Sequence, residues 1–557
     1  MDGSEKQKMP KMKDEEVKEL IKKYPHLEDY VKKIEKKSGR PDFYSVLPFE
    51  VRDEKSPNII YPAQGLVFVH IFKTVDMDVK EYHPIEPKLS VDEQKKHDLL
   101  LELIVKKAPK KESVRSDEEL KKVLQEIIDE TIEIDERAEK ADFEGKKGRK
   151  KKISKIKATS VQKRSIEYYV LKNIVGTSQI ECFMRDPWLE DIHIVAGEKI
   201  HLIHKVFGMI KTNIEIDKDD ADIFTRKLSE KMGSPVSEGN PIADGVLPDG
   251  SRGNLVYSDA ISIKGPSMTI RRFTETPISV TQLIKWGTMS AGVAAYLWIC
   301  CEYGRNFFIC GGTACGKTTT MNSIIPFIPP ERKIYTAEGT PEMQVPHKVW
   351  QQLLTKDSGP VEGRVTMFDL LRAALRSRPE YIIPGEVRGA EGNIVFGAMQ
   401  TGHPVMTTFH ASTVTKVIQR FTSDPINVPK TFMDNLDFVV IQLAIERDGK
   451  LMRRVTNIDE IEGYNREVDG IMSRNAFEWD ALSDEHKFVA NRNSYILEER
   501  IAKTAGYKDL AEIYNVYDER KHILERMVEE EIMDYYEVVQ FIWSYYREGA
   551  KGLPIKL

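Results

Sequence analysis

The stretch GGTACGKT at residues 311–318 constrains the fold of this 557-residue chain more than any other segment. It follows the apolar run NFFIC and precedes a segment with helical spacing. Glycines let a backbone loop close round phosphate oxygens, so that its N–H groups and the next helix N-terminus point at them. The pattern G-x-x-x-x-G-K-[ST] between a strand and a helix is typical of a phosphate-binding P-loop. The predicted nucleotide-binding residues are Gly311, Gly312, Thr313, Ala314, Cys315, Gly316, Lys317, Thr318 and Thr319.

Two side chains of this loop carry the chemistry that a triphosphate requires. Lys317 would meet the β- and γ-phosphates, and the Thr318 hydroxyl would be a ligand of Mg²⁺. The loop therefore predicts ATP and Mg²⁺ as the cofactors. A glycine-rich turn with an incidental lysine is the structural alternative, and the flanking strand and helix disfavour it.

A second acidic element ends the run YIIPGE at residues 381–386. Glu386 comes at the carboxyl end of a predicted strand, where ligands gather in open α/β sheets. Gly385 stands where many P-loop enzymes carry a metal-binding Asp, so we expect Glu386 to act on the attacking water or to reach Mg²⁺ through a water. An ion pair with Arg388 is the alternative role for this carboxylate.

Further candidate catalytic residues flank two more predicted strands. The strand KIYTAE ends at Glu338, and Glu342 follows four residues later. Two such carboxylates could serve as general base and water-orienting group. The segment TGHPVMTTFHA places His403 and His410 on either side of a strand, where a histidine can sense the γ-phosphate by hydrogen bonding. Turn formation by the glutamates and ordinary structural roles for the histidines are the alternatives.

Composition narrows the class of protein. With 83 Lys and Arg against 88 Asp and Glu, the chain lacks the basic excess of a dedicated nucleic-acid binder. Its five cysteines form no C-x-x-C pair, which argues against a zinc ribbon or a secreted disulfide framework and favours a reducing cytoplasm. The most hydrophobic long stretch, 292–310, is interrupted by charged residues, so we expect no segment to span a bilayer.

Hydrophobic patterning divides the chain into five parts. The last part contains apolar strands that alternate with helical stretches, the pattern of a parallel α/β sheet, and it ends in a helical tail. We predict an α/β fold in which this core follows a smaller α+β domain and a mixed, largely helical N-terminal region. The predicted divisions are the N-terminal region 1–145, a basic linker or exposed loop 146–159, the α+β domain 160–275, an inter-lobe linker 276–290 and the core 291–557.

The basic part of the chain has eight Lys or Arg among residues 146–157. Such a run could contact anionic lipid or nucleic acid through phosphate charge, or could be a solvated stretch with no dedicated partner. It contains no aromatic residue, whereas proteins that bind single-stranded nucleic acid combine base stacking with a positive groove.

Taken in order, these segments resemble the type II/type IV secretion ATPase superfamily, whose members power pilus, secretion and archaellum machines. The similarity runs from about residue 160 to the C-terminus. It includes DPWLEDIHIVAGEKIHLIH and SDAISIKGPSMTIRRF in the small domain, then the P-loop, an acidic box from Glu338 to Glu342, a Walker B element at Gly385-Glu386 and the histidine box TGHPVMTTFHAST.

Two details refine the resemblance. The segment FIPPERKIYTAEGTPEMQVPHKVWQQLLT and the aromatic helical tail look like the archaeal branch, most like the archaellum motor ATPase. Gly339 stands where the acidic box usually has an Asp, and the sequence lacks the four-cysteine zinc insert that bacterial relatives often carry.

The resemblance implies a RecA-like P-loop core and an ATP hydrolase that works as a hexameric ring. ATP would lie between the small domain and the core. Arginines of the small domain or of a neighbouring subunit would complete the site, because guanidinium groups offset the charge of the γ-phosphate in the transition state. The candidate arginines are Arg252, Arg271, Arg272, Arg372, Arg376 and Arg378.

The implied partners are further copies of the chain and an integral membrane platform protein at the inner face of the cell membrane, with anionic lipid as a further candidate. A nucleic-acid translocase is one alternative function, since RecA-like rings also drive such machines. A nucleotide sensor that does not hydrolyse ATP is another, because of Gly339 and the missing Walker B Asp.

Overall fold

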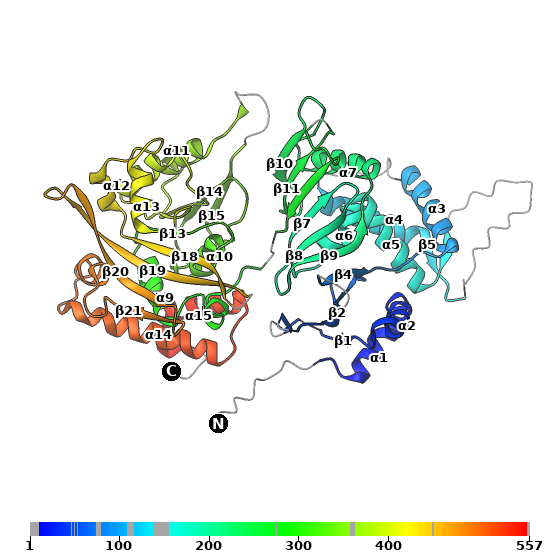
Figure 1. The fold of residues 1–557 in the computed structure, drawn as a ribbon, viewed down its shortest axis with the longest axis horizontal. Coiled ribbons are helices and arrows are strands. Elements are labelled where there is room, and N and C mark those ends of the chain that lie inside the picture. Colours follow the sequence, from blue (N-terminus) through cyan, green and yellow to red (C-terminus); the bar gives the residue numbers. More distant parts are fainter. Residues whose placement is uncertain are drawn as a thin grey trace, which may run out of the picture. The chain divides into compact units, whose positions relative to one another are not determined.

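The computed structural model describes residues 11–553 except 46, 49, 50, 53, 74–78, 108–115, 138–154, 260, 274, 275, 357–362, 448 and 449. The chain folds into two units, Met1–Phe273 and Thr274–Leu557 (Figure 1). Each unit is built round hydrophobic clusters of its own.

The N-terminal unit contains a ten-stranded sheet in the order β1-β2-β3-β4-β9-β8-β7-β12-β11-β10. Neighbouring strands are antiparallel except for the parallel pairs β1–β2 and β4–β9. The strands are β1 (Asp42–Phe43), β2 (Asn58–Pro62), β3 (Phe68–Phe72), β4 (Glu81–Ile85), β7 (Leu189–Val195), β8 (Lys199–His204), β9 (Gly208–Glu215), β10 (Ile242–Val246), β11 (Arg252–Val256) and β12 (Ser267–Arg271).

Helices of this unit cover two further hydrophobic clusters. Helices α1 (Asp14–Lys23) and α2 (Pro25–Ser38) bury Val17 and Leu27 against the first strands. A second cluster joins α3 (Val91–Lys107), α4 (Asp117–Thr131) and α5 (Ser160–Ile174) to the short parallel pair β5 (Ile132–Ile134) and β6 (Ile156–Ala158). The unit also contains α6 (Glu181–Met184) and α7 (Lys218–Lys231).

The sheet crosses the domain boundary that the sequence suggests at residue 145. Strands β1–β4 lie before this boundary and β7–β12 after it, and both groups contribute to one core. The reason is physical: a few antiparallel strands are marginally stable alone, and pairing β4 with β9 extends both groups into one sheet. Most of the basic run, residues 146–154, lies outside the described residues, while Lys157 is part of β6.

The C-terminal unit contains the predicted α/β core. One sheet has the order β17-β13-β18-β19-β20-β21, with β17, β13 and β18 parallel and the rest antiparallel; a second, parallel sheet has the order β15-β14-β16. The strands are β13 (Phe307–Cys310), β14 (Ile334–Glu338), β15 (Trp350–Leu354), β16 (Tyr381–Pro384), β17 (Met406–Phe409), β18 (Phe438–Arg447), β19 (Lys450–Asn465), β20 (Gly470–Asp480) and β21 (Glu485–Phe488).

Helix α9 (Ala291–Glu302) lies at the centre of this unit, with every residue from Ala291 to Cys301 buried. Helices α14 (Ile513–Glu529) and α15 (Tyr535–Glu548) contribute to the same core. The remaining α-helices are α8 (Val280–Lys285), α10 (Lys317–Ile324), α11 (Met367–Ser377), α12 (Gly392–Gln400) and α13 (Val414–Thr422).

Part of the segment expected to link two lobes, residues 276–290, packs within the C-terminal unit. The Ser279 hydroxyl donates to the Met533 carbonyl at 2.7 Å, and the Thr281 hydroxyl donates to the Ile532 carbonyl at the same distance. Helix α8 is therefore attached to the C-terminal helices.

The structure confirms the predicted α/β fold class, with a parallel-stranded core after an α+β unit. None of the helices described here combines the length and the apolar character needed to cross a bilayer.

Candidate nucleotide site

The phosphate-binding motif forms the bend between β13 and α10. Strand β13 is fully buried between β17 and β18 and ends at Cys310, and α10 begins at Lys317. Gly316 has φ +93°, a left-handed conformation that favours glycine, and Ala314 has φ +58°. At Gly311, a Cβ atom would overlap the Gln442 carbonyl oxygen and come within 2.5 Å of Cys315 Sγ. The bend therefore requires glycine at 311 for space and favours it at 316 for conformation.

Lys317 lies across this bend. Its Nζ donates to the carbonyl oxygens of Gly312 at 2.8 Å and Gly311 at 3.3 Å, and the residue is only 8% exposed. Gly312, Thr313 and Ala314 are exposed, while Thr318 and Thr319 are half-buried on the first turn of α10. The bend thus presents open backbone with an ammonium group beside it, the arrangement that an anion needs.

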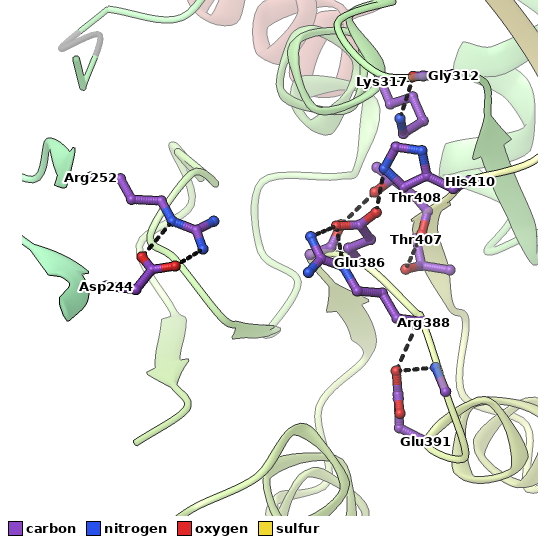
Figure 2. A network of polar contacts seen from close by, with 12 residues as sticks. Asp244, Arg252, Gly312, Lys317, Glu386, Arg388, Glu391, Thr407, Thr408 and His410 are labelled. Atoms are coloured by element: carbon purple, nitrogen blue, oxygen red, sulfur yellow. Dashed lines mark hydrogen bonds and ion pairs between the residues drawn. The ribbon is translucent and has the colours of Figure 1, made fainter. Parts of the chain in front are cut away.

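Glu386 lies just beyond β16 and contacts two basic side chains (Figure 2). Its Oε2 accepts hydrogen bonds from Arg388 Nη2 at 2.6 Å and Nε at 2.9 Å, and its Oε1 is 2.8 Å from His410 Nε2. The Thr408 hydroxyl, on β17, donates to the Gly385 carbonyl at 2.7 Å and ties the ends of the two strands together. The ion pair with Arg388 that the sequence offered as an alternative is therefore present.

His410 lies close both to Glu386 and to the phosphate loop, as we call the bend at residues 311–316. Figure 2 shows its ring between Lys317 and Glu386. Burial lowers the pKa of His410 below 6.5, and the nearby Lys317 charge lowers it further, against the opposite effect of Glu386. An ammonium, an imidazole and a carboxylate thus gather at the edge where β13, β16 and β17 end.

Glu338 lies at the same edge, but both oxygens of its carboxylate already accept hydrogen bonds from nearby residues of the same unit. Its Oε2 accepts hydrogen bonds from the backbone N–H groups of Glu342 at 2.7 Å and Met343 at 2.8 Å, and its Oε1 accepts one from Gln352 at 3.0 Å. The residue is buried, and burial raises the pKa of its carboxyl group. Glu342 is half-buried, and its carbonyl accepts from the Asn322 amide at 2.8 Å. In this conformation Glu338 shapes the turn that follows β14.

His403 lies at the other end of β17 from His410. It precedes the strand, and its ring nitrogen Nδ1 is 3.0 Å from the Thr401 hydroxyl oxygen. Because β17 and β13 are parallel, the start of β17 is at the sheet edge opposite the phosphate loop. The two histidines therefore lie on either side of β17, as predicted, but only His410, of these two candidate residues, is at the edge where the phosphate loop lies.

The candidate arginines of the N-terminal unit differ in their contacts. Arg252 makes a two-pronged ion pair with Asp244, at 3.1 and 2.9 Å (Figure 2). Arg272 donates to the carbonyl oxygens of Asp186 and Met184, the latter at 2.6 Å. Arg271 is exposed on β12, opposite Arg252 on β11. In the C-terminal unit, Arg372 and Arg376 are exposed on α11, and Arg378 is exposed just after it.

Two residues that contact the phosphate loop were not predicted. Gln442 of β18 donates from Nε2 to the Cys315 carbonyl at 2.7 Å, and Arg453 of β19 donates from Nε to the Ala314 carbonyl at 3.1 Å. A signal existed for Gln442, a polar residue within the apolar run FVVIQLAI, because a buried amide needs partners. The sequence around Arg453 offers no such signal.

Comparison with known proteins places these features in a family. The family described as "Type II/IV secretion system protein" matches residues 180–536, which is more than half of the chain. MJ0900, an uncharacterised protein of Methanocaldococcus jannaschii, is 50% identical over 98% of this chain and 99% of its own length. The conjugal transfer protein TrbB of Rhizobium radiobacter is 30% identical over 44% of this chain and 75% of its own length.

A solved structure, that of the pilus retraction motor PilT with bound ADP, covers 66% of this chain and 94% of its own, at 17% identity and a TM-score of 0.34. The family match over residues 180–536 shows the family by itself, because the relative that spans nearly the whole chain is uncharacterised. The chain belongs to the type II/IV secretion system protein family.

Proposed function

We propose that this protein hydrolyses ATP and uses the energy to drive a membrane-bound secretion or filament machine, of the archaellum or type IV pilus kind. The observation that carries the proposal is the gathering of Lys317, His410 and Glu386 beside an open phosphate-binding bend. Family membership supports a motor of this class.

In the proposed reaction, water attacks the γ-phosphate of ATP, the bond between the γ-phosphorus and the oxygen that bridges it to the β-phosphate breaks, and ADP leaves. The backbone N–H groups of residues 311–316 and the Lys317 ammonium hold the phosphates, and Glu386 accepts the proton of the attacking water. His410 lies 2.8 Å from Glu386 Oε1 and stays neutral, so that it adds no second positive charge next to Lys317. Glu342 and Glu338 are retained as weaker candidates for the base, Glu338 because it is only 1% exposed, whereas Glu386 is part-exposed and can meet a water.

The donor set suits Mg²⁺ as well as ATP. Thr318 offers a hydroxyl on the first turn of α10, and Glu386 offers a carboxylate that can hold a metal-bound water. When bound, Mg²⁺ would offset charge on the phosphate oxygens. Thr318 is therefore the proposed direct ligand and Glu386 the proposed indirect one.

We further propose that a ring of six copies, on the pattern that the family resemblance implies, completes the site with arginines. Arg271 is exposed and Arg252 is part-exposed, so a neighbouring subunit or a domain movement could engage either. Arg272 already donates to two carbonyl oxygens within its own unit, which fits a structural role.

The partners of such a motor would be an integral membrane platform protein and, as a second contact, anionic lipid at the inner face of the cell membrane. Residues 1–145 and the basic run 146–157 are the proposed contact regions. Replacing the eight basic residues by Gln should reduce co-sedimentation with anionic liposomes, and equal sedimentation of both proteins would contradict the lipid contact.

Phosphate release from the purified chain tests the enzymatic proposal. K317A should lower turnover by at least about 100-fold, because the charge on the phosphates is lost. E386Q should lower kcat by about 10²–10⁴-fold while ATP still binds, whereas E342Q should have a much smaller effect. Turnover of K317A at the parent rate would refute the site. Stimulation of turnover by DNA but not by lipid would instead favour the translocase.

A further inference from the structure

A β-hairpin donates hydrogen bonds to the phosphate loop. This hairpin is part of neither the P-loop, the acidic box, the Walker B element nor the histidine box. Strands β18 and β19 form this hairpin, and each supplies one side chain that donates to a carbonyl oxygen of the loop. The two carbonyls belong to consecutive residues, Ala314 and Cys315. The loop is therefore anchored at two adjacent peptide groups.

Gln442 is fixed at both ends of its amide. Its Nε2 donates to the Cys315 carbonyl at 2.7 Å, and its Oε1 accepts from the Thr320 hydroxyl at 2.8 Å. Gln442 is 1% exposed and Thr320 fully buried, so water cannot replace either bond. The pairing register of β18 with β19 shifts between Ile441 and Gln442. Such a bulge re-aims side chains, and here it occurs at the residue that reaches the loop.

Arg453 acts on the neighbouring peptide. Its Nε donates to the Ala314 carbonyl at 3.1 Å, and its Cδ is the second-nearest atom to a Cβ built on Gly316, at 3.2 Å. Ala314 has φ +58°, a conformation that costs energy for a residue with a side chain. A contact that holds the Ala314 carbonyl therefore helps to keep this conformation in place.

The direction of a carbonyl fixes the direction of the next N–H group. In a trans peptide the C=O of one residue and the N–H of the next point to opposite sides. Holding the Ala314 and Cys315 carbonyls toward the hairpin turns the N–H groups of Cys315 and Gly316 the other way. An anion site is built from N–H groups that converge on one point, and an inward carbonyl would repel the phosphate.

We propose that Gln442 and Arg453 are positioning residues that set the affinity of the phosphate loop for ATP by orienting these two peptides. The inference rests on the proposed function, since it concerns the same nucleotide. Neither side chain is proposed to touch the phosphates or the attacking water.

The test compares ATP affinity and kcat in the full-length chain. Q442E has nearly the same shape as the parent but replaces the N–H donor by an oxygen that repels the Cys315 carbonyl. R453A removes the second donor, and R453Q keeps a donor without the charge. R447A is the matched control, because Arg447 lies on the same hairpin and donates to the Ala481 carbonyl at 3.1 Å, away from the loop.

Binding of a fluorescent ATP analogue should weaken at least 10-fold in Q442E and 3- to 10-fold in R453A, and stay within 2-fold of the parent in R447A. The KM for ATP should rise by similar factors, while kcat at saturating ATP changes less than 3-fold. R453Q should bind within 3-fold of the parent, since a positioning role needs the donor and not the charge.

Failure of the proposal is separable from failure of the proposed function. If the parent binds no ATP analogue, or K317A binds it equally well, the nucleotide site itself is wrong. If K317A loses binding while Q442E and R453A bind as the parent does, the positioning role of Gln442 and Arg453 is refuted. If R453Q binds as weakly as R453A, Arg453 acts through its charge and its positioning role is refuted. If Q442E does not fold, the affinities of R453A and R453Q for the ATP analogue test the proposal without it.

Discussion

At the scale of single residues, the phosphate loop has space for a Cβ atom at Gly312 and none at the neighbouring Gly311. A Cβ on Gly311 would overlap the Gln442 carbonyl oxygen, which is part of the β18 backbone and cannot move away. A Cβ on Gly312 would meet nothing within 4 Å. G311A should therefore lower the free energy of unfolding by about 1–3 kcal/mol and abolish nucleotide binding. G312A should leave the free energy of unfolding nearly unchanged.

Urea unfolding and binding of an ATP analogue measure the two effects. Equal behaviour of G311A and G312A would mean that β18 yields at this point, and would weaken the view that the strand fixes the loop.

The same scale shows which site residues a sequence can identify. Lys317, Glu386 and His410 all follow strands whose carboxyl ends meet at one edge, because β13 is parallel to β17 and isolated parallel bridges join β16 to β17. Glu338 also follows a strand, but its carboxylate can act on a water only if the next turn does not fold back and donate its N–H groups to it. The spacing of residues in the sequence does not predict whether that turn folds back. His403 precedes its strand, so topology places it at the opposite edge.

At the scale of elements, helix α9 depends on the helix that covers it. Arg520 of α14 is buried, forms an ion pair with Glu302 at the end of α9, and lies with its guanidinium carbon 5.0 Å from the centre of the Trp298 ring. R520A leaves Glu302 without this partner and opens a gap over Trp298. We expect a loss of about 3–5 kcal/mol in the free energy of unfolding.

R526A is the control for this prediction. Arg526 is on the same helix and pairs with Glu529 and Glu530, which are exposed, so its loss should cost no more than about 1 kcal/mol. Urea unfolding of the three proteins measures both values. A similar small loss in both variants would show that α9 is held by apolar contacts alone.

The strands of the parallel core could be predicted because each is a continuous apolar run, such as NFFIC before the loop or FVVIQLAI on β18. Strands β19 and β20 could not, since MRRVTNIDEIEGYN and its partner are rich in charged residues. Their stability comes from cross-strand pairing, which depends on residues distant in the sequence. This is also why Arg453, on β19, could not be connected to the loop in advance.

At the scale of the whole molecule, the N-terminal unit should be sensitive to acid. His204 is buried, with Nδ1 accepting the Val206 backbone N–H at 3.0 Å and Nε2 3.1 Å from the Tyr61 hydroxyl oxygen. Burial lowers the pKa of His204 to about 3, whereas the unfolded chain has the ordinary value of 6.5. As the pH falls below 6.5, His204 becomes protonated in the unfolded state but stays neutral in the folded state. The free energy of unfolding therefore decreases.

From pH 6.5 to 4.5, His204 should account for a loss of about 2–3 kcal/mol, at about 1.4 kcal/mol per pH unit. Over the same pH range, the free energy of unfolding of H204Q should fall by about 2–3 kcal/mol less than that of the parent, although H204Q is less stable at pH 6.5. H201Q, a half-exposed position on the same strand, should follow the parent. Urea unfolding at the two pH values decides, and identical acid dependence of the parent and H204Q would contradict the assignment.

The pairing of β4 with β9 has a practical consequence for the design of truncated forms of this protein. The two strands meet at only two residue pairs, Glu81 with Lys211 and Tyr82 with Thr212. A chain that starts at residue 180, where the family match begins, and keeps the rest would lose β4 and leave β9 as a bare sheet margin with unpaired N–H and C=O groups. Such margins recruit strands from other molecules. The shortened protein should self-associate through β9, and assemblies seen with it would not report on those of the intact chain.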